Sequence, residues 1–298
     1  LEAGKTYKLQ VEYFDNGGDC FAGFYWKAPS AGSQNVLARF GDAGKVAAEC
    51  DVTVAVLGIN KSIEREGQDR FSLELPVDQQ EFIKELYKVN PNTVVVLVAG
   101  SSMAVNWMDE NVPAILNAWY PGEQGGNAVA EVLFGDYNPG GRLPLTYYNS
   151  LDEIPAFDNY SVKGRTYQYF EGQPLYEFGY GLSYTKFRYK SKGVNVEQDT
   201  VKVSFEVSNT GKYDGDEVAQ VYVKYPETGT YMPLKQLHGF KRVHIKKGKT
   251  SKVTIGVPKK DLRYWDEQER KFVTPKGEYT FMVGASSDDI KFRETVGL

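Results

Sequence analysis

The sequence has few of the residues that most metal and redox sites require. Its 298 residues include two cysteines, Cys20 and Cys50, and two histidines, His238 and His244. A structural zinc site takes four cysteine or histidine ligands, and a Ser-His-Asp triad needs a histidine beside its nucleophile. Because both histidines fall within a predicted β region, we expect no metal, no cofactor and no such triad. The cysteines are too few for a disulfide framework, so they are either free buried thiols or a single bridge.

Long hydrophobic runs and an excess of positive charge are also missing. No apolar stretch approaches the roughly 18–20 residues of a transmembrane helix. The net charge of −4 argues against a nucleic-acid partner, and no basic tract suggests a membrane surface. The sequence opens on Leu1 without a methionine or a signal peptide, so the residues do not give the compartment directly. Aromatic residues are abundant, with 21 tyrosines and 16 phenylalanines.

Three regions differ in their hydrophobic period. Residues 1–34 show the two-residue alternation of strands around a turn at residues 15–18, and two strands need partners to bury a core. Residues 35–186 alternate helical segments with the apolar runs 52–59, 93–99 and 114–119, which predicts a parallel sheet with helical crossovers. We expect the strand at residues 52–59 to be buried on both faces. Helices are expected at residues 42–49, from Pro76 to about residue 89, and at residues 125–134.

Residues 187–298 return to a two-residue period. Val201, Val203, Phe205 and Val207 alternate with polar residues, and about seven short strands separated by turn signals follow one another. This pattern is typical of an antiparallel sandwich of the fibronectin type III kind. The predicted fold class is therefore α/β followed by all-β: a three-layer α/β sandwich and then a β-sandwich.

The most informative segment is the charged loop that follows the first apolar run. Glu64, Glu66 and Asp69 alternate there with Arg65 and Arg70. In open α/β sheets, ligands bind at the carboxyl ends of the strands, and glycoside hydrolysis uses a pair of carboxyl groups. A solvated loop with mutually paired charges is the alternative. We expect Asp69 and Arg70 to hold the loop through a salt bridge.

Other candidate groups have two interpretations each. The GEQGG segment at residues 122–126 precedes a helix, but it lacks the nucleotide-binding glycine pattern and the Walker lysine, so a packing turn is favoured over a nucleotide site. Trp107, Trp119 and Tyr120 are candidates for stacking on a sugar, although packing is favoured for each. Two interpretations are kept for Arg142 and Arg165: a place in a ligand site and a purely structural role. A nucleotide-binding α/β protein is kept as a competing class.

Three long blocks carry a resemblance to a known family. Residues 63–83 (IEREGQDRFSLELPVDQQEFI), 107–147 (WMDENVPAILNAWYPGEQGGNAVAEVLFGDYNPGGRLPLTY) and 165–187 (RTYQYFEGQPLYEFGYGLSYTKF) resemble, in order, the C-terminal part of glycoside hydrolase family 3. The first 30 residues are similar to the closing strands of a protective-antigen-like carbohydrate-binding domain that some members carry as an insertion. The resemblance thus implies three units: residues 1–34, residues 35–186 and residues 187–298.

The resemblance also implies an activity and an incomplete site. Family members are retaining, exo-acting β-glycosidases that release terminal non-reducing β-linked sugars. Their general acid/base glutamate matches Glu66 here, with Glu64 as the runner-up. Their nucleophilic aspartate lies on a preceding (β/α)₈ barrel, for which this chain has no counterpart. The chain is therefore expected to be part of a larger β-glucosidase or β-xylosidase, possessing the acid/base and inactive alone.

Two further implications follow from the same resemblance. The expected partners are an oligosaccharide or glycoside substrate and the missing barrel, and the expected location is secreted or periplasmic. The alternative to an enzyme part is a folded but inactive fragment, or a carbohydrate-binding module without catalysis. The residues do not separate glucosides from xylosides or arabinofuranosides.

Overall fold

The computed structural model of the protein describes residues 5, 6, 8 and 39–298. The predicted strands of residues 1–34 and Cys20 therefore lie outside the described residues, apart from three isolated positions. The α/β part contains α1 (Ala43–Glu49), β1 (Thr53–Gly58), α2 (Val77–Val89), β2 (Thr93–Val98), α3 (Asn106–Asn111), β3 (Ile115–Asn117) and α4 (Gly125–Phe134). A long segment with the short turns η2 (Leu151–Glu153) and α5 (Thr166–Tyr169) leads into the β part.

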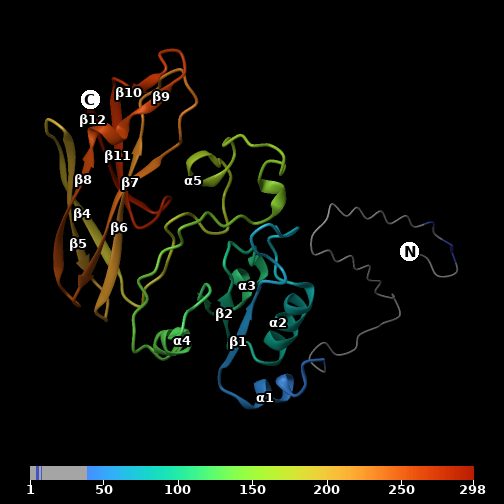
Figure 1. Cartoon of the computed structure of the whole chain (residues 1–298). Coiled ribbons are helices and arrows are strands. Elements are labelled where there is room, and N and C mark those ends of the chain that lie inside the picture. The colour runs from blue at the N-terminus through green and yellow to red at the C-terminus, as the bar shows by residue number, and fades with distance from the viewer. Residues whose placement is uncertain (1–4, 7, 9–38) are drawn as a thin grey trace.

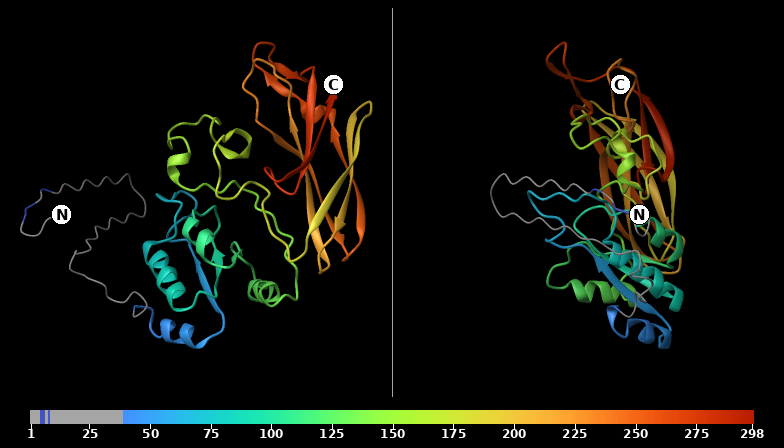
Figure 2. Two further views of the ribbon diagram at one scale, coloured as in Figure 1. Left: turned by 180° about the vertical axis from the view of Figure 1, so that it is seen from behind. Right: turned by 90° about the vertical axis from the view of Figure 1, so that its right-hand side faces the viewer.

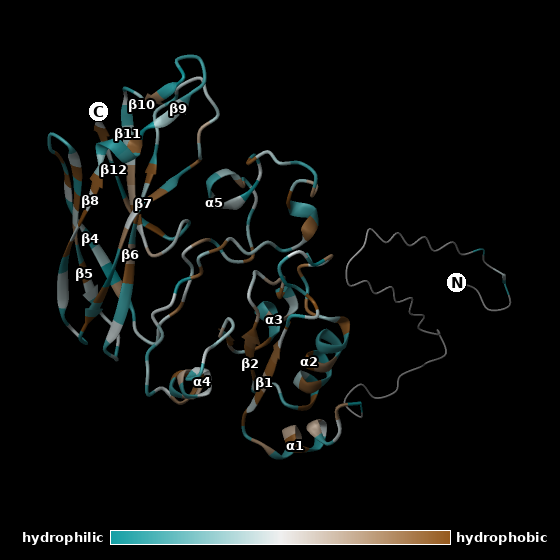
Figure 3. Cartoon of the chain, in the orientation of Figure 1, coloured by the Kyte–Doolittle hydropathy of each residue, from teal (hydrophilic) through white to brown (hydrophobic). Residues whose placement is uncertain are grey.

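The α/β part is built on a parallel sheet with the order β1-β2-β3. The expected parallel pairing is confirmed. Strands β1 and β2 are brown, hydrophobic arrows in Figure 3, and helices α1, α2 and α3 contribute side chains to the core of this part. That core unites β-branched and aliphatic side chains of the strands with those of the helices: Ala47, Ala55, Leu57, Ile83, Leu86, Val95, Leu97, Val105 and Met108.

The helices begin and end where the sequence predicts. Pro76 is the N-cap of α2, and its fixed φ suits the entry into a helix. Ile83 and Leu86 lie on the buried face of α2, as their spacing requires. Gly135 ends α4 with a left-handed φ of 82°, a conformation that costs glycine little.

The expectation that β1 is buried on both faces is wrong. Ala55 and Leu57 are buried, but Val54 is 45% exposed and Val56 is 65% exposed. The reason is that residues from 39 onward cover the second face of β1 only in part, while the core packs on its other face. A continuous apolar run predicts burial on both faces of a strand. Here the core packs on only one face of β1.

The β part is a sandwich of two antiparallel sheets, β12-β11-β6-β7 and β4-β5-β8. The bounds are β4 (Phe187–Val196), β5 (Thr200–Asn209), β6 (Gly215–Lys224), β7 (Gln236–Ile245), β8 (Thr250–Pro258), β11 (Glu278–Gly284) and β12 (Ile290–Gly297), with η3 (Lys259–Leu262) and a hairpin of β9 (Tyr264–Asp266) and β10 (Lys271–Val273) between β8 and β11. Val201, Val203, Phe205 and Val207 are fully buried between the sheets. The predicted sandwich is confirmed, although the sequence reading did not identify β9, β10 or β12.

The segment between α4 and β4 runs along the sandwich and joins the two parts (Figures 1 and 2). Arg142 in this segment donates to Glu217 on β6 across 2.8 Å, and both side chains are almost fully buried. The hydroxyl of Tyr189 on β4 donates to the other oxygen of Glu217 at 2.6 Å. Burial, together with the neighbouring Glu217 carboxylate, raises the pKa of Tyr189 well above its usual value. This network fixes the segment to the sandwich.

Removing Arg142 should destabilise the protein strongly. Arg142→Ala leaves the carboxylate of Glu217 buried without its cation, and breaking a buried ion pair in this way costs about 3–5 kcal/mol. Urea denaturation measures the loss. The matched control is Lys88→Ala, which breaks the exposed pair of Lys88 and Glu85 and should change the free energy of unfolding by about 0.5 kcal/mol or less. Equal effects of the two substitutions would contradict the role given to Arg142.

Candidate functional site at the carboxyl end of the parallel sheet

The charged loop begins at Gly58, where β1 and β2 lie too close for a side chain. A Cβ on Gly58 would lie 1.8 Å from the carbonyl oxygen of Val98, so only glycine fits there. The side chain of Gln79 on α2 hydrogen-bonds to both backbone groups of Gly58. Its Nε2 donates to the carbonyl at 2.7 Å, and its Oε1 accepts from the N–H at 2.8 Å. The point at which the chain leaves the sheet is thereby fixed from two sides.

Glu64 is held in place within the loop. Its Oε2 accepts hydrogen bonds from the hydroxyl of Ser101 at 2.6 Å and from Nε of Arg70 at 2.8 Å. Arg70 is only 10% exposed and also donates to the carbonyl of Ser102 at 2.8 Å. The loop after β1 is therefore fastened to the loop after β2. Arg70 does anchor the loop, as expected, but its partner is Glu64 and Asp69 is exposed.

Glu66 occupies a different environment, two residues further on. Arg65 and Gln68 exchange backbone hydrogen bonds of 3.2 and 2.9 Å, so Glu66 and Gly67 form the tip of a tight turn. Gly67 has a φ of 73°, which this turn position requires. Glu66 is exposed, and no hydrogen bond or ion pair joins it to any described residue. Glu64 is therefore hydrogen-bonded and ion-paired, whereas Glu66 makes no such contact with the described residues.

Aromatic side chains accompany the loop at this edge of the sheet. The ring of Tyr120, which follows β3, lies against Gly100, where a Cβ would come within 2.4 Å of its Cε2. Tyr120 is 51% exposed. Trp119 has a φ of 56°, an uncommon conformation for a bulky residue. The exposed ring of Tyr120 is thus available to a ligand at this edge.

A buried polar pair lies beneath the same edge. Nδ2 of Asn117, the last residue of β3, donates to the hydroxyl of Tyr147 at 2.9 Å. Burial raises the pKa of Tyr147 to about 12, against the opposing effects of that hydrogen bond and of the positive charge of Arg70. Tyr147 therefore keeps its proton at neutral pH. The sequence reading missed Ser101, Asn117 and Tyr147, although a Gly-Ser-Ser run after a buried strand is a usable signal.

The remaining candidates from the sequence have structural roles. Trp107 packs edge-on against Tyr87, with ring centroids 5.6 Å apart. Arg165 donates to the carbonyls of Pro155, Ala156, Asn159 and Ser161 and so organises its own loop.

The histidines and the described cysteine do not assemble a centre. His238 Nε2 lies 2.9 Å from the hydroxyl of Tyr225, and His244 pairs with Asp216 on the neighbouring strand. Cys50 is exposed rather than buried. Within the part of the chain that the structure describes, no three acidic, histidine or cysteine residues form a metal-binding cluster.

Comparison with known proteins identifies relatives along most of the chain. Residues 8–184 match the glycosyl hydrolase family 3 C-terminal domain, and residues 217–287 match the fibronectin type III-like domain. A xylan 1,4-β-xylosidase of Xylanibacter ruminicola is 43% identical over 225 residues, which is 75% of this chain and 26% of that protein. A periplasmic β-glucosidase of Salmonella typhimurium is 33% identical over 287 residues, covering 91% of this chain and 37% of that protein.

Solved structures give the same result. The crystal structure of a selenomethionine-labelled β-glucosidase from Kluyveromyces marxianus superimposes with a TM-score of 0.80 at 37% identity, over 86% of this chain and 34% of that one. The chain thus spans about a quarter to two fifths of the length of the relatives it matches.

Charge removal at the two glutamates should separate their roles. Glu64→Gln leaves the nearly buried guanidinium of Arg70 without its counterion, and we expect a loss of about 1–3 kcal/mol in the free energy of unfolding. Glu66→Gln changes an exposed group that has no partner in the described part of the chain, so its free energy of unfolding should stay within about 0.5 kcal/mol of that of the parent protein. Urea denaturation of both variants measures the difference. A larger loss for Glu66→Gln would refute the assignment of Glu64 as the structural carboxylate.

Proposed function

The chain belongs to glycosyl hydrolase family 3, and we propose that it is the C-terminal portion of a retaining, exo-acting β-glycosidase. In this proposal it supplies the general acid/base, Glu66, and a preceding (β/α)₈ barrel supplies the nucleophilic aspartate. One observation carries the assignment: Glu66 is an exposed carboxylate, unpaired among the described residues, at the tip of a loop that leaves the carboxyl end of a parallel sheet. The proposed units are residues 1–34, 35–186 and 187–298.

The proposed reaction follows from the two carboxyl groups that retention requires. The aspartate of the barrel attacks the anomeric carbon while Glu66 gives its proton to the departing glycosidic oxygen, so the bond to the leaving group breaks as the glycosyl–enzyme bond forms. Glu66, now ionised, takes a proton from water, which attacks the same carbon and releases the aspartate. The second step returns Glu66 to its acid form.

The environments of the two glutamates support Glu66 over Glu64 for this task. A group that exchanges its proton twice per turnover must reach the substrate and change its hydrogen bonds at each step. Glu64 accepts from Ser101 and Arg70, and breaking those bonds would release the loop from β2. Glu66 is exposed and has no such bonds among the described residues. Its position at the tip of a turn lets it extend toward a second domain.

The uncovered face of the sheet supports a partner for this chain. Val54 and Val56 are exposed on one face of β1, whose outer edge is unpaired within residues 39–298. Exposed apolar edge strands are rare in isolated soluble proteins, because they invite pairing with other chains. Phe71, beside the Glu66 loop, is fully exposed as well. We propose that the preceding part of the enzyme covers these side chains.

The proposed substrates are β-linked glucosides or xylosides, because the relatives include named β-glucosidases and a xylan 1,4-β-xylosidase. The proposed location is secreted or periplasmic, and it is supported by the relative that is named as periplasmic. No helix among the described residues is both long and apolar enough to cross a membrane. A folded module without catalysis is the second candidate function, since no nucleophile has been assigned among the described residues.

In the complete enzyme, Glu66→Gln should reduce hydrolysis of substrates with poor leaving groups by about 10²–10⁴-fold, the usual contribution of general acid–base catalysis. Aryl glycosides with good leaving groups need no proton in the first step, so azide should restore their turnover as glycosyl azide. Steady-state kinetics on both substrate types and product analysis measure this. If azide restores turnover for Glu64→Gln and not for Glu66→Gln, the two assignments are exchanged.

The chain by itself should not hydrolyse aryl β-glucosides or aryl β-xylosides. In the proposal the nucleophile lies on the barrel, so the rate at which the chain alone releases the aryl group should equal that of a Glu66→Gln control. Addition of the polypeptide that bears the barrel should raise the rate. Turnover by the chain alone that disappears in the control would show that its nucleophile lies within these residues.

A further inference from the structure

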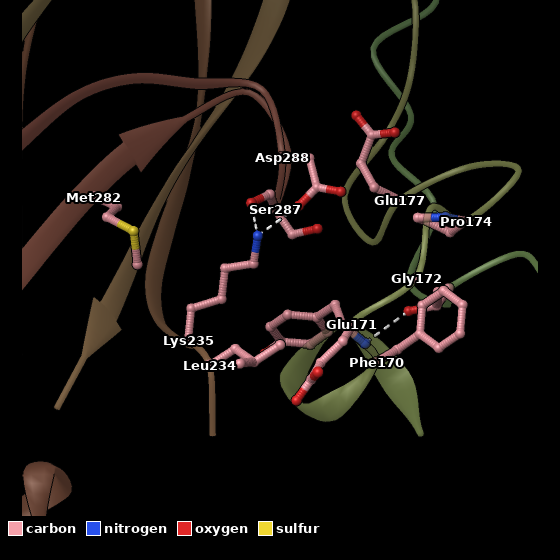
Figure 4. Close-up of a pocket in the computed structure, with 12 residues that line it drawn as sticks. Phe170, Glu171, Gly172, Pro174, Glu177, Leu234, Lys235, Met282, Ser287 and Asp288 are labelled. Carbon is pink, nitrogen blue, oxygen red and sulfur yellow. Dashed lines mark hydrogen bonds and ion pairs between the residues drawn. The ribbon is translucent and has the colours of Figure 1, made fainter. Parts of the chain in front are cut away.

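A cavity lies between the segment around α5 and the β-sandwich, and it shares no lining residue with the Glu66 loop. Its volume of about 430 Å³ falls within the roughly 300–1,000 Å³ of ligand pockets. Figure 4 shows the two walls: Lys235, Ser287 and Asp288 come from the sandwich, whereas Phe170 and Glu177 come from the segment.

One buried polar atom in this cavity lacks a partner. Ser287 is 1% exposed, and its hydroxyl makes no hydrogen bond with any described residue. Buried hydroxyl groups nearly always have a partner, so an exception needs an explanation. The backbone around it is fixed: the N–H of Ser287 donates to the carbonyl of Phe178 at 2.8 Å, and the hydroxyl of Ser286 donates to Oε1 of Glu177 at 2.7 Å. The backbone at Ser287 is thus held in place, and its hydroxyl makes no hydrogen bond among the described residues.

Further hydrogen-bonding capacity surrounds this hydroxyl. Lys235 Nζ donates to the carbonyl of Ser287 and to Asp288 Oδ1, which leaves one of its three N–H groups. Glu177 uses one oxygen for Ser286, and no bond to its other oxygen is made by the described residues. Glu171 is exposed on the same wall and is likewise unpaired there. The cavity wall therefore offers both hydrogen-bond donors and acceptors.

Charge and shape restrict the class of ligand. Three carboxylates and one ammonium give the wall a negative balance, which disfavours an anion, and the carboxylates do not gather into a metal-binding cluster among the described residues. Phe170 and Tyr167 add aromatic surface, and the ring of Tyr167 is held by stacking on Phe178 at 4.3 Å between centroids. A ligand that fits has hydroxyl groups that both donate and accept, apolar faces and no negative charge.

We propose that this cavity is a second carbohydrate site, which binds a neutral mono- or disaccharide with the hydroxyl of Ser287 as one of its hydrogen-bonding groups. Sugar hydroxyls accept a hydrogen bond from the remaining N–H of Lys235 and donate to the available oxygens of Glu177 and Glu171. An apolar face of the sugar packs on Phe170. The site is independent of the acid/base assignment, because it requires neither Glu66 nor a barrel.

The test is a titration of the full chain with cellobiose and with xylobiose, followed by saturation-transfer NMR and calorimetry. We expect saturable binding of at least one disaccharide. Ser287→Ala and Glu171→Ala should each weaken it about five- to tenfold, the effect of one lost hydrogen bond. The melting temperature of Ser287→Ala should be unchanged or raised without sugar, because the variant removes an unsatisfied buried group. Glu131→Ala, which alters an exposed acid on α4, should bind as the parent does.

Three results would overturn the proposal. The first is no saturable binding of either disaccharide. The second is binding that Ser287→Ala and Glu171→Ala leave unchanged while the parent melting temperature is retained. The third is binding that Glu66→Ala weakens and Ser287→Ala does not, which would place the sugar at the loop after β1.

Discussion

The parallel, in-register pairing of β1 with β2 is the constraint on which the candidate active site depends. It runs from Thr53 opposite Thr93 to Gly58 opposite Val98, so both strands end at the same level. Everything chemical at this edge follows from that alignment. The loop after β1 lies beside the loop after β2, and one serine and one arginine suffice to join them through Glu64. A one-residue shift would move every side chain of β1 to the other face and put Gly58 out of reach of Gln79.

The charged residues divide into those that hold the fold and those left for a ligand. Glu64 with Arg70, and Glu217 with Arg142, are shielded pairs that join separate segments. Such pairs fix the relative positions of the segments they join. They add little net stability, because the cost of desolvating the charges offsets much of their attraction. Glu66, two residues from one of these pairs, makes no ion pair with any residue that the structure describes. In the proposed mechanism, the ion pair of Glu64 with Arg70 would keep the shape of the loop while Glu66 exchanges protons.

The two candidate sites lie in different parts of the chain. The first is the loop after β1 with Glu66 at its tip, and the second is the cavity lined by Ser287 and Phe170. The second site exists only because the segment around α5 packs on the sandwich. The ion pair of Arg142 with Glu217 fixes the same segment, so the domain junction that gives the protein its shape also forms the cavity.

The sequence alone determined the element types, the order of the α/β and β parts, the parallel pairing and the family. These depend on local patterns: Pro76 before α2, Gly135 after α4, the alternation of Val201 to Val207, and long family-specific blocks. It also directed attention to Glu64 and Glu66, because their loop follows a buried strand.

Only the tertiary structure decided the roles of these residues. Which glutamate is bound depends on Ser101 and Arg70, and the contact with Ser101 joins residues 37 positions apart. Whether Val54 and Val56 are buried depends on what packs on the second face of β1. Arg142 has a structural role through Glu217, 75 positions away. The cavity at Ser287 combines segments more than a hundred residues apart. Local patterns record a residue's own preferences, whereas burial, ion pairing and cavities depend on what the fold brings next to it.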